Sequence, residues 1–253
     1  MEYIELDKTN FDIKKKLLSS GYESEIFVYP YENREMLIKK YYDLDQVNVD
    51  KIEMINKLKT RFLIKPNKLI KVENEVIGFS MDYMKGFYPI NILKSIMSDK
   101  DKYNLLMTLK NEMINLKNQN CIYGDLSLKN VITDGINVRL CDSVNVKIDD
   151  YNFDQISSTM QNYYDLKGTF EGIDYYMLNL LTIYLLNDIE YDQILKIMEE
   201  NLISRFNNKE YINYRGIMDN QECMEICYNM ISDDVTKDFL IDYVSIDKEK
   251  TII

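Results

Sequence analysis

The feature that most constrains the fold is a change of periodicity near residue 86. Before it, short extended runs rich in β-branched and aromatic residues surround a single stretch with helical spacing. After it, apolar residues recur mostly at intervals of three and four, as in packed helices. Strands and helices segregated in this way are typical of an α+β architecture. We therefore expect a β-rich lobe over residues 1–85, a mainly α-helical lobe over 86–253, and a cleft between them.

The first region reads as three strands, a helix and two more strands. Extended segments flank Gly21, and a third strand covers residues 36–41. Residues 47–62 have apolar positions at helical spacing, and residues 69–81 predict a hairpin around a short polar turn.

The second region is dominated by helical patterns, and Gly86 and Pro89 mark its beginning. We expect helices over residues 90–97, 103–118, 173–186, 191–206 and 222–244. The first two precede a stretch of extended character, and the third is the most apolar segment of the chain.

The stretch Tyr123–Asp142 contains the most suggestive polar residues. Its turn signal, Asp134-Gly135, lies between two short extended runs and predicts a β-hairpin. Asn130 at the entry of this hairpin would then lie near Asp142 at its exit, with Asp125 just upstream. Hard oxygen ligands of this kind suit Mg²⁺ and the phosphates that it carries. Asp, Asn and Gly are also common turn formers, so the spacing can arise by chance.

The composition excludes several other chemistries. The chain has no histidine, so a Ser-His-Asp triad, a Cys-His pair and a histidine-bound zinc site are all impossible. A net charge of −11 argues against nonspecific nucleic-acid binding, which needs clustered lysine and arginine. No apolar run is long enough to span a bilayer, and the N-terminus lacks a signal-peptide pattern. Four cysteines without C-x-x-C spacing favour reduced thiols in a cytoplasmic protein.

Several segments, in the right order, resemble the protein-kinase-like superfamily. The catalytic-loop motif H-R-D-x-x-x-x-N resembles Tyr123-Gly124-Asp125 with Asn130. The other matches are D-F-G with Asp142-Ser143-Val144, V-A-I-K with residues 36–39, the hinge M-E-Y-M-x-G with residues 81–86, and the central helix of the helical lobe with residues 174–186. The resemblance spans nearly the whole chain and implies a bilobal fold.

The resemblance also implies roles for individual residues. Asp125 would orient the attacking hydroxyl and accept its proton, while Asn130 and Asp142 would hold Mg²⁺ on the phosphates of ATP. Lys39, which follows Leu37 in the A-x-K register, would bind the α- and β-phosphates, with Lys40 as its competitor.

The remaining implied contacts concern the nucleotide. Glu53, on the first-region helix, would pair with Lys39. The phosphate-covering loop would run from Gly21 through Ser24 to Ile26. The backbone of Asp82 and Met84 would hydrogen-bond the adenine, and Met81 would sit at the back of the pocket.

The departures from the family pattern leave the substrate open. The loop from Gly21 keeps one glycine of three, Gly124 replaces the arginine, and Ser143-Val144 replaces Phe-Gly. No A-P-E motif follows. The first hypothesis is an atypical serine/threonine kinase that acts on a protein hydroxyl. A small-molecule kinase of the aminoglycoside- or choline-kinase type and a pseudokinase acting as a scaffold are the alternatives.

Overall fold

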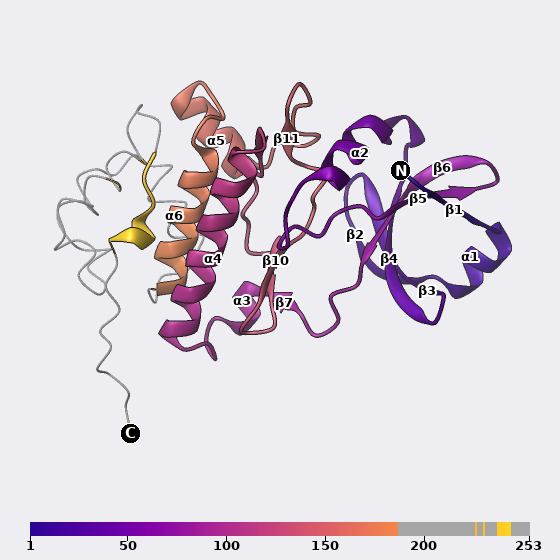
Figure 1. Cartoon of the computed structure of the whole chain (residues 1–253), viewed down its shortest axis with the longest axis horizontal. Helices are drawn as coiled ribbons and strands as arrows, with labels where there is room; N and C mark the ends of the chain where they lie inside the picture. Colours follow the sequence, from indigo (N-terminus) through magenta and orange to yellow (C-terminus); the bar gives the residue numbers. More distant parts are fainter. Residues whose placement is uncertain (187–225, 227–229, 231–236, 244–253) are drawn as a thin grey trace. The chain divides into compact units, whose positions relative to one another are not determined.

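The computed structural model describes residues 1–186, 226, 230 and 237–243 (Figure 1). These residues divide into two compact units. The first contains residues 1–87 together with 142–144, and the second contains the described residues of 88–141 and those from 145 onward. Strands dominate the first unit and the long helices lie in the second, so the protein is of the mixed α+β class.

The first unit is built on one sheet. Its strands are β1 (Tyr3–Leu6), β2 (Lys16–Ser20), β3 (Ser24–Tyr31), β4 (Arg34–Tyr41), β5 (Lys68–Val72) and β6 (Glu75–Asp82), in the order β1-β5-β6-β4-β3-β2. Only β1 and β5 are parallel. The turns at Glu32-Asn33 and Glu73-Asn74 have positive φ at both residues, as two-residue hairpins require. The strands expected over 36–41 and the hairpin over 69–81 are confirmed, whereas β1 was not anticipated.

One face of this sheet is closed by α1 (Lys8–Lys14). Phe11 of α1 packs its ring against Phe27 and Tyr29 of β3, with centroids 5.9 and 5.8 Å apart. Asp7 caps the helix by accepting a hydrogen bond from the Asn10 amide. The apolar residues of this face form a continuous buried cluster.

The helix between β4 and β5 is shorter than expected. A 3₁₀ turn, η1 (Leu44–Gln46), precedes α2 (Val49–Lys57), and the expected helix over 47–62 ends there. Lys65 donates from Nζ to the carbonyl oxygens of Asn56 and Leu58, at 2.8 and 2.6 Å, and so satisfies the end of the helix. The Thr60 hydroxyl then accepts hydrogen bonds from two downstream amides, which favours a turn over further helix.

The second unit is organised around two helices that lie side by side (Figure 1). These are α4 (Asp99–Lys117) and α6 (Ile173–Leu186), and every residue of α6 except Tyr175 is buried. A helix apolar on all sides is typical of a core position. No helix among the described residues is long and apolar enough to cross a membrane.

Shorter elements surround this pair. They are β7 (Tyr88–Pro89), α3 (Ile90–Leu93), β8 (Cys121–Ile122), β9 (Val131–Thr133), β10 (Val138–Leu140), β11 (Lys147–Ile148), α5 (Ser158–Lys167) and η3 (Leu240–Asp242). The predicted hairpin is confirmed, since β9 and β10 pair in antiparallel register. The expected helix over 191–206, most of that over 222–244, and the cysteines at 223 and 227 lie outside the described residues.

Candidate functional site

An ion pair in the first unit joins two of the predicted site residues. Lys39 Nζ lies 2.8 Å from Asp142 Oδ1, although the two residues are 103 positions apart in sequence. Lys39 is only 8% exposed, so this pair is partly shielded from water. Asp142 has a φ of +50°, a left-handed conformation that non-glycine residues adopt at some cost and often at functional sites. A buried ammonium group thus pairs with the carboxylate of a residue whose backbone is left-handed.

Four other predicted residues share a sheet face with Lys39. Ile26 is the cross-strand partner of Lys39, Met81 is the partner of Leu37, and Ser24 lies two residues before Ile26 on β3. Cross-strand partners, and residues two apart on one strand, point to the same face. Lys40, the competitor of Lys39, therefore points to the opposite face.

Gly78 explains how β6 can approach Lys39. A Cβ atom at this position would lie 1.9 Å from the carbonyl oxygen of Lys39, a separation that no rotation of a side chain could relieve. Glycine within a strand often marks such a close approach of two backbones. The position of Lys39 thus depends on a glycine in the neighbouring strand.

The predicted phosphate-covering loop is a tight turn between β2 and β3. The Gly21 amide donates to the carbonyl of Ser24 at 2.9 Å, and the Tyr42 amide donates to the carbonyl of Glu23 at 2.9 Å. Tyr22 at the tip is 94% exposed. The Gly21 N–H is therefore already paired in this conformation, and other amides of the turn would have to bind a phosphate.

The predicted hinge residues follow at the end of β6. Asp82 is the last residue of this strand, and its Oδ1 accepts a hydrogen bond from Asn67 Nδ2 at 2.8 Å. The carbonyl of Met84 accepts one from the Phe87 amide at 3.2 Å, which closes a short turn. Both residues thus lie in an ordered connection out of the sheet.

The expected pairing of Glu53 with Lys39 is not formed. Glu53 on α2 instead accepts a hydrogen bond from the ammonium group of Met1, while Lys39 binds Asp142. The buried residues of α2 are Lys51, Ile52 and Ile55, so Glu53 lies at the margin of the packed face. The sequence pattern predicted the helix that carries Glu53 but predicted the wrong partner for Lys39.

In the second unit, Asp125 and Asn130 are brought together. Asn130 Nδ2 donates to Asp125 Oδ2 at 2.8 Å, which orients both side chains. The Cys141 amide donates to the carbonyl of Asn130 at 2.8 Å, and Tyr123 donates from its hydroxyl to the carbonyl of Cys141 at 2.6 Å. The residue immediately before Asp142 is therefore held by the same loop that carries Asp125.

Asp174, at the start of α6, was not among the predicted site residues. Its two carboxylate oxygens accept hydrogen bonds from the backbone amides of Tyr123 and Gly124, at 3.1 and 2.7 Å. Burial raises the pKa of this carboxyl to about 6, although the two amide hydrogen bonds oppose the shift. The sequence did contain a signal for this residue, since Asp174 is the only acidic residue of the mostly apolar helix α6 and lies in its first turn.

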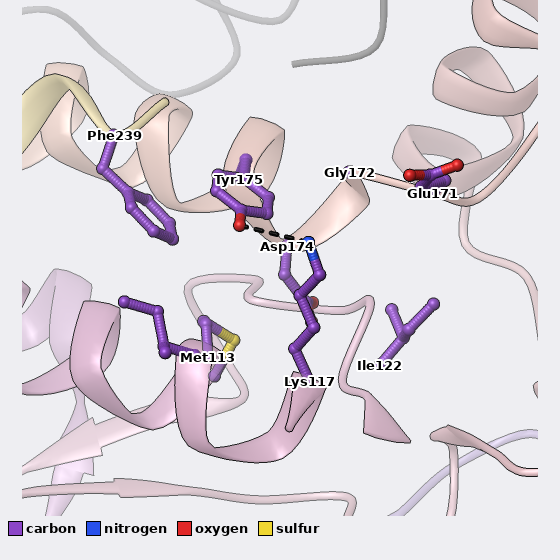
Figure 2. A pocket seen from close by; sticks show the side chains of 9 residues that line it. Met113, Lys117, Ile122, Glu171, Gly172, Asp174, Tyr175 and Phe239 are labelled. Carbon is purple, nitrogen blue, oxygen red and sulfur yellow. Dashed lines mark hydrogen bonds between the residues drawn. The ribbon is translucent and has the colours of Figure 1, made fainter. Parts of the chain in front are cut away.

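A small pocket lies next to Asp174 (Figure 2). Its volume is about 60 Å³, and Asp174 and Ile122 form part of its wall. Lys117 donates to the Tyr175 hydroxyl at 3.3 Å, and the Tyr175 ring stacks on Phe239 at a centroid distance of 4.4 Å. This pocket is far smaller than the several hundred Å³ typical of nucleotide-sized ligands.

The two residues that the resemblance implies as magnesium ligands belong to different units, Asn130 to the second and Asp142 to the first. Asn130 donates from its amide nitrogen to Asp125, which leaves its Oδ1 as the atom that could bind a cation, and Asp142 accepts from Lys39 at Oδ1. Both are hard oxygen ligands. Across the described part of the chain, no three His, Cys, Asp or Glu side chains gather closely enough to hold a metal. A bound Mg²⁺ would therefore depend on phosphate oxygens and water for its other ligands, as it commonly does.

The comparisons with known proteins add no relative. A scan against protein-family models and a search of curated proteins both found no match to this chain.

Proposed function

We propose that this chain is an ATP- and Mg²⁺-dependent phosphotransferase that transfers the γ-phosphate to a hydroxyl group of a protein. The observation that carries the proposal is the ion pair between Lys39 and Asp142, two residues that the family resemblance assigns to phosphate and metal binding. The hydrogen-bonded pair of Asp125 and Asn130 gives independent support from the second unit.

We further propose that the two units are the lobes of a kinase-like fold. The first unit supports this with three antiparallel strands, a helix and two more strands, with β1 and α1 added at its beginning. The second supports it with a loop and hairpin that carry Asp125 and Asn130 and are anchored to a buried helix.

The proposed chemistry assigns each side chain one task. Asp125, oriented by Asn130, accepts the proton of the acceptor hydroxyl. Lys39 would bind nonbridging phosphate oxygens, and the Asp142 carboxylate and the Asn130 amide oxygen would be the protein ligands of the cation. When bound, Mg²⁺ neutralises the charge of the phosphates in the transition state.

Turnover by the purified chain tests the proposal. With ATP and Mg²⁺, the wild type should phosphorylate itself or slowly hydrolyse ATP, and Asp142→Ala should reduce this at least about 100-fold, because both the cation ligand and the partner of Lys39 are lost. Asp165→Ala, which changes an exposed acid on α5, is the matched control and should leave turnover unchanged. Equal silence of wild type and Asp142→Ala, with no nucleotide binding by either, would rule the proposal out.

Two further measurements separate the alternatives. A thermal shift with ATP that depends on Mg²⁺, without turnover, would indicate a nucleotide-binding scaffold. ADP release that appears only with aminoglycosides or amino alcohols would indicate a small-molecule acceptor instead of a protein.

A further inference from the structure

We propose that Phe153 is a positioning residue for the loop Tyr123–Asp125. Its ring fills the space that any side chain at position 124 would occupy, and it holds the loop that presents Asp125 without any phosphorylated residue. The inference rests on the proposed function, because Asp125 is the base in that reaction.

The contact at Gly124 is unusually close. A Cβ atom built on Gly124 would lie 2.5 Å from Cε1 and 2.8 Å from Cζ of Phe153, and 3.3 Å from the terminal methyl of Met160. Gly124 also has a φ of +79°, which glycine adopts at little cost. The Phe153 ring therefore packs directly against the backbone of the residue next to Asp125.

Phe153 is itself held by neighbouring rings. It meets Phe170 edge-to-face, with centroids 5.1 Å apart and an interplanar angle of 74°. Phe170 in turn contacts Tyr164 of α5, at a centroid distance of 4.9 Å. Edge-to-face pairs of this kind stabilise a defined orientation. The ring over Gly124 is thus oriented by its direct contact with Phe170, whereas Tyr164 meets Phe170 and lies one ring further from Gly124.

Backbone contacts fix the rest of the segment that follows Asp142. β11 pairs with β8, so Ile148 lies opposite Cys121. The Asp149 amide donates to the carbonyl of Asn120 at 3.1 Å. Further along, the Gln155 amide donates to Asn145 Oδ1 at 2.8 Å. The Asp149 bond, the pairing of β11 with β8 and the Phe153 contact hold this segment against residues 120–124, and the Gln155 bond closes the segment on itself.

Asp174 and Phe153 therefore restrain the same loop in different ways and both act at Gly124. Asp174 accepts hydrogen bonds from the amides of Tyr123 and Gly124, and Phe153 packs where a Gly124 side chain would project. The family resemblance expects at position 124 an arginine that binds a phosphorylated segment. In this chain Gly124 has no side chain, and the Phe153 ring joins the segment after Asp142 to the loop Tyr123–Asp125. We therefore expect the conformation of this loop not to depend on phosphorylation.

Hydrogen exchange tests this placement without any need for activity. Phe153→Ala should raise the exchange rates of the Tyr123 and Gly124 amides about tenfold or more, because the loop loses the packing restraint next to these amides. Phe153→Leu should restore most of the protection. Tyr164→Ala is the matched control, since it removes a ring from the same cluster but leaves Phe153 on Gly124. It should leave the two amides unchanged.

Kinetics test the positioning role itself. Phe153→Ala should lower kcat for phosphoryl transfer about 10- to 100-fold while KM for ATP stays within about threefold, since misplacing a reacting group affects the chemical step more than binding. Phosphatase treatment of the wild type should not change its kcat. A Phe153→Ala protein that is folded and exchanges like the wild type would overturn the inference, as would Tyr164→Ala with the same effect.

The two proposals fail separately. If the wild type neither binds nor turns over ATP, the proposed function fails, while the exchange experiment still decides whether Phe153 restrains the loop. If the wild type is active and Phe153→Ala has unaltered kcat and exchange, only the present inference fails.

Discussion

Two glycine-containing turns carry predicted site residues, and they are built in opposite ways. At Gly124 the backbone is left-handed, an aromatic ring packs against it, and a buried carboxylate accepts its amide hydrogen. At Gly21 the nearest atom to a built Cβ is the Ser24 carbonyl oxygen at 3.6 Å, and the neighbouring Tyr22 is almost fully exposed. The conformation of the Gly124 turn is therefore stabilised by several independent contacts. That of the Gly21 turn depends on little more than the pairing of the two strands it connects.

The difference follows from what each turn would have to do. Under the proposed function Asp125 is a general base, which must be held to within a fraction of an ångström, so its loop needs several independent restraints. The Gly21 turn would cover the nucleotide, and loops that open and close over a ligand belong to the least stable parts of a protein. One glycine in place of three would then be tolerable at the Gly21 turn, whereas Gly124 is required by its surroundings.

Gly124→Ala should have the largest effect. The added methyl group would meet Phe153 and force alanine into left-handed backbone, which together should lower the free energy of unfolding by about 3 kcal/mol. Chemical denaturation measures the change. Adding Phe153→Leu should recover the steric part of the loss but not the backbone part. A Gly124→Ala protein as stable as the wild type would show that the loop is no better specified than the Gly21 turn.

Asp174→Ala should have the second largest effect and lower the free energy of unfolding by about 2 kcal/mol. It leaves the buried amides of Tyr123 and Gly124 without their acceptor, and this loss outweighs the relief of removing a desolvated charge. Asp165→Ala, on the surface of α5, should change the free energy of unfolding by less than about 0.5 kcal/mol. Equal effects of the two substitutions would contradict the anchoring role.

The pH dependence of stability should expose the same carboxylate. The pKa of Asp174 is raised from 3.8 to about 6 by burial, so the folded state binds more protons than the unfolded state between these values. The stabilisation that the Asp174 carboxyl gains from this pKa difference is fully present below about pH 4 and is lost as the pH rises through 6. The free energy of unfolding of the wild type, relative to Asp174→Asn, should therefore fall across this window by up to about 3 kcal/mol. A flat difference would exclude the shift.

The parts of the fold that depend on local sequence patterns could be predicted from the sequence. Alternation and turn residues predicted the strands over 36–41 and 69–81, and Asp134-Gly135 predicted the hairpin that leads from Asn130 to Asp142. These features depend on neighbours in sequence. Strand alternation singled out Lys39 over Lys40, but the predicted partner of Lys39 was Glu53, and the structure pairs it with Asp142 instead.

What the sequence could not indicate depends on distant contacts. The partner of Glu53 is set by where the chain places Met1, and the end of α2 is set by Lys65 reaching back from eight residues beyond. Phe153 lies in a stretch without periodicity, so nothing in the pattern connects it with Gly124. Strand β1 is short and pairs in parallel with a strand more than 60 residues away, a pairing that no local signal announces.

Gly21→Ala should have the smallest effect and completes the comparison. Gly21 is not among the residues with positive φ, and a methyl group there would make only an ordinary contact with the Ser24 carbonyl oxygen. Alanine also reduces the conformational freedom of the unfolded chain, which favours the folded state by up to about 1 kcal/mol. The free energy of unfolding measured by chemical denaturation should therefore stay equal or rise slightly. A loss of more than about 1 kcal/mol would mean that this turn is as tightly specified as the loop at Gly124.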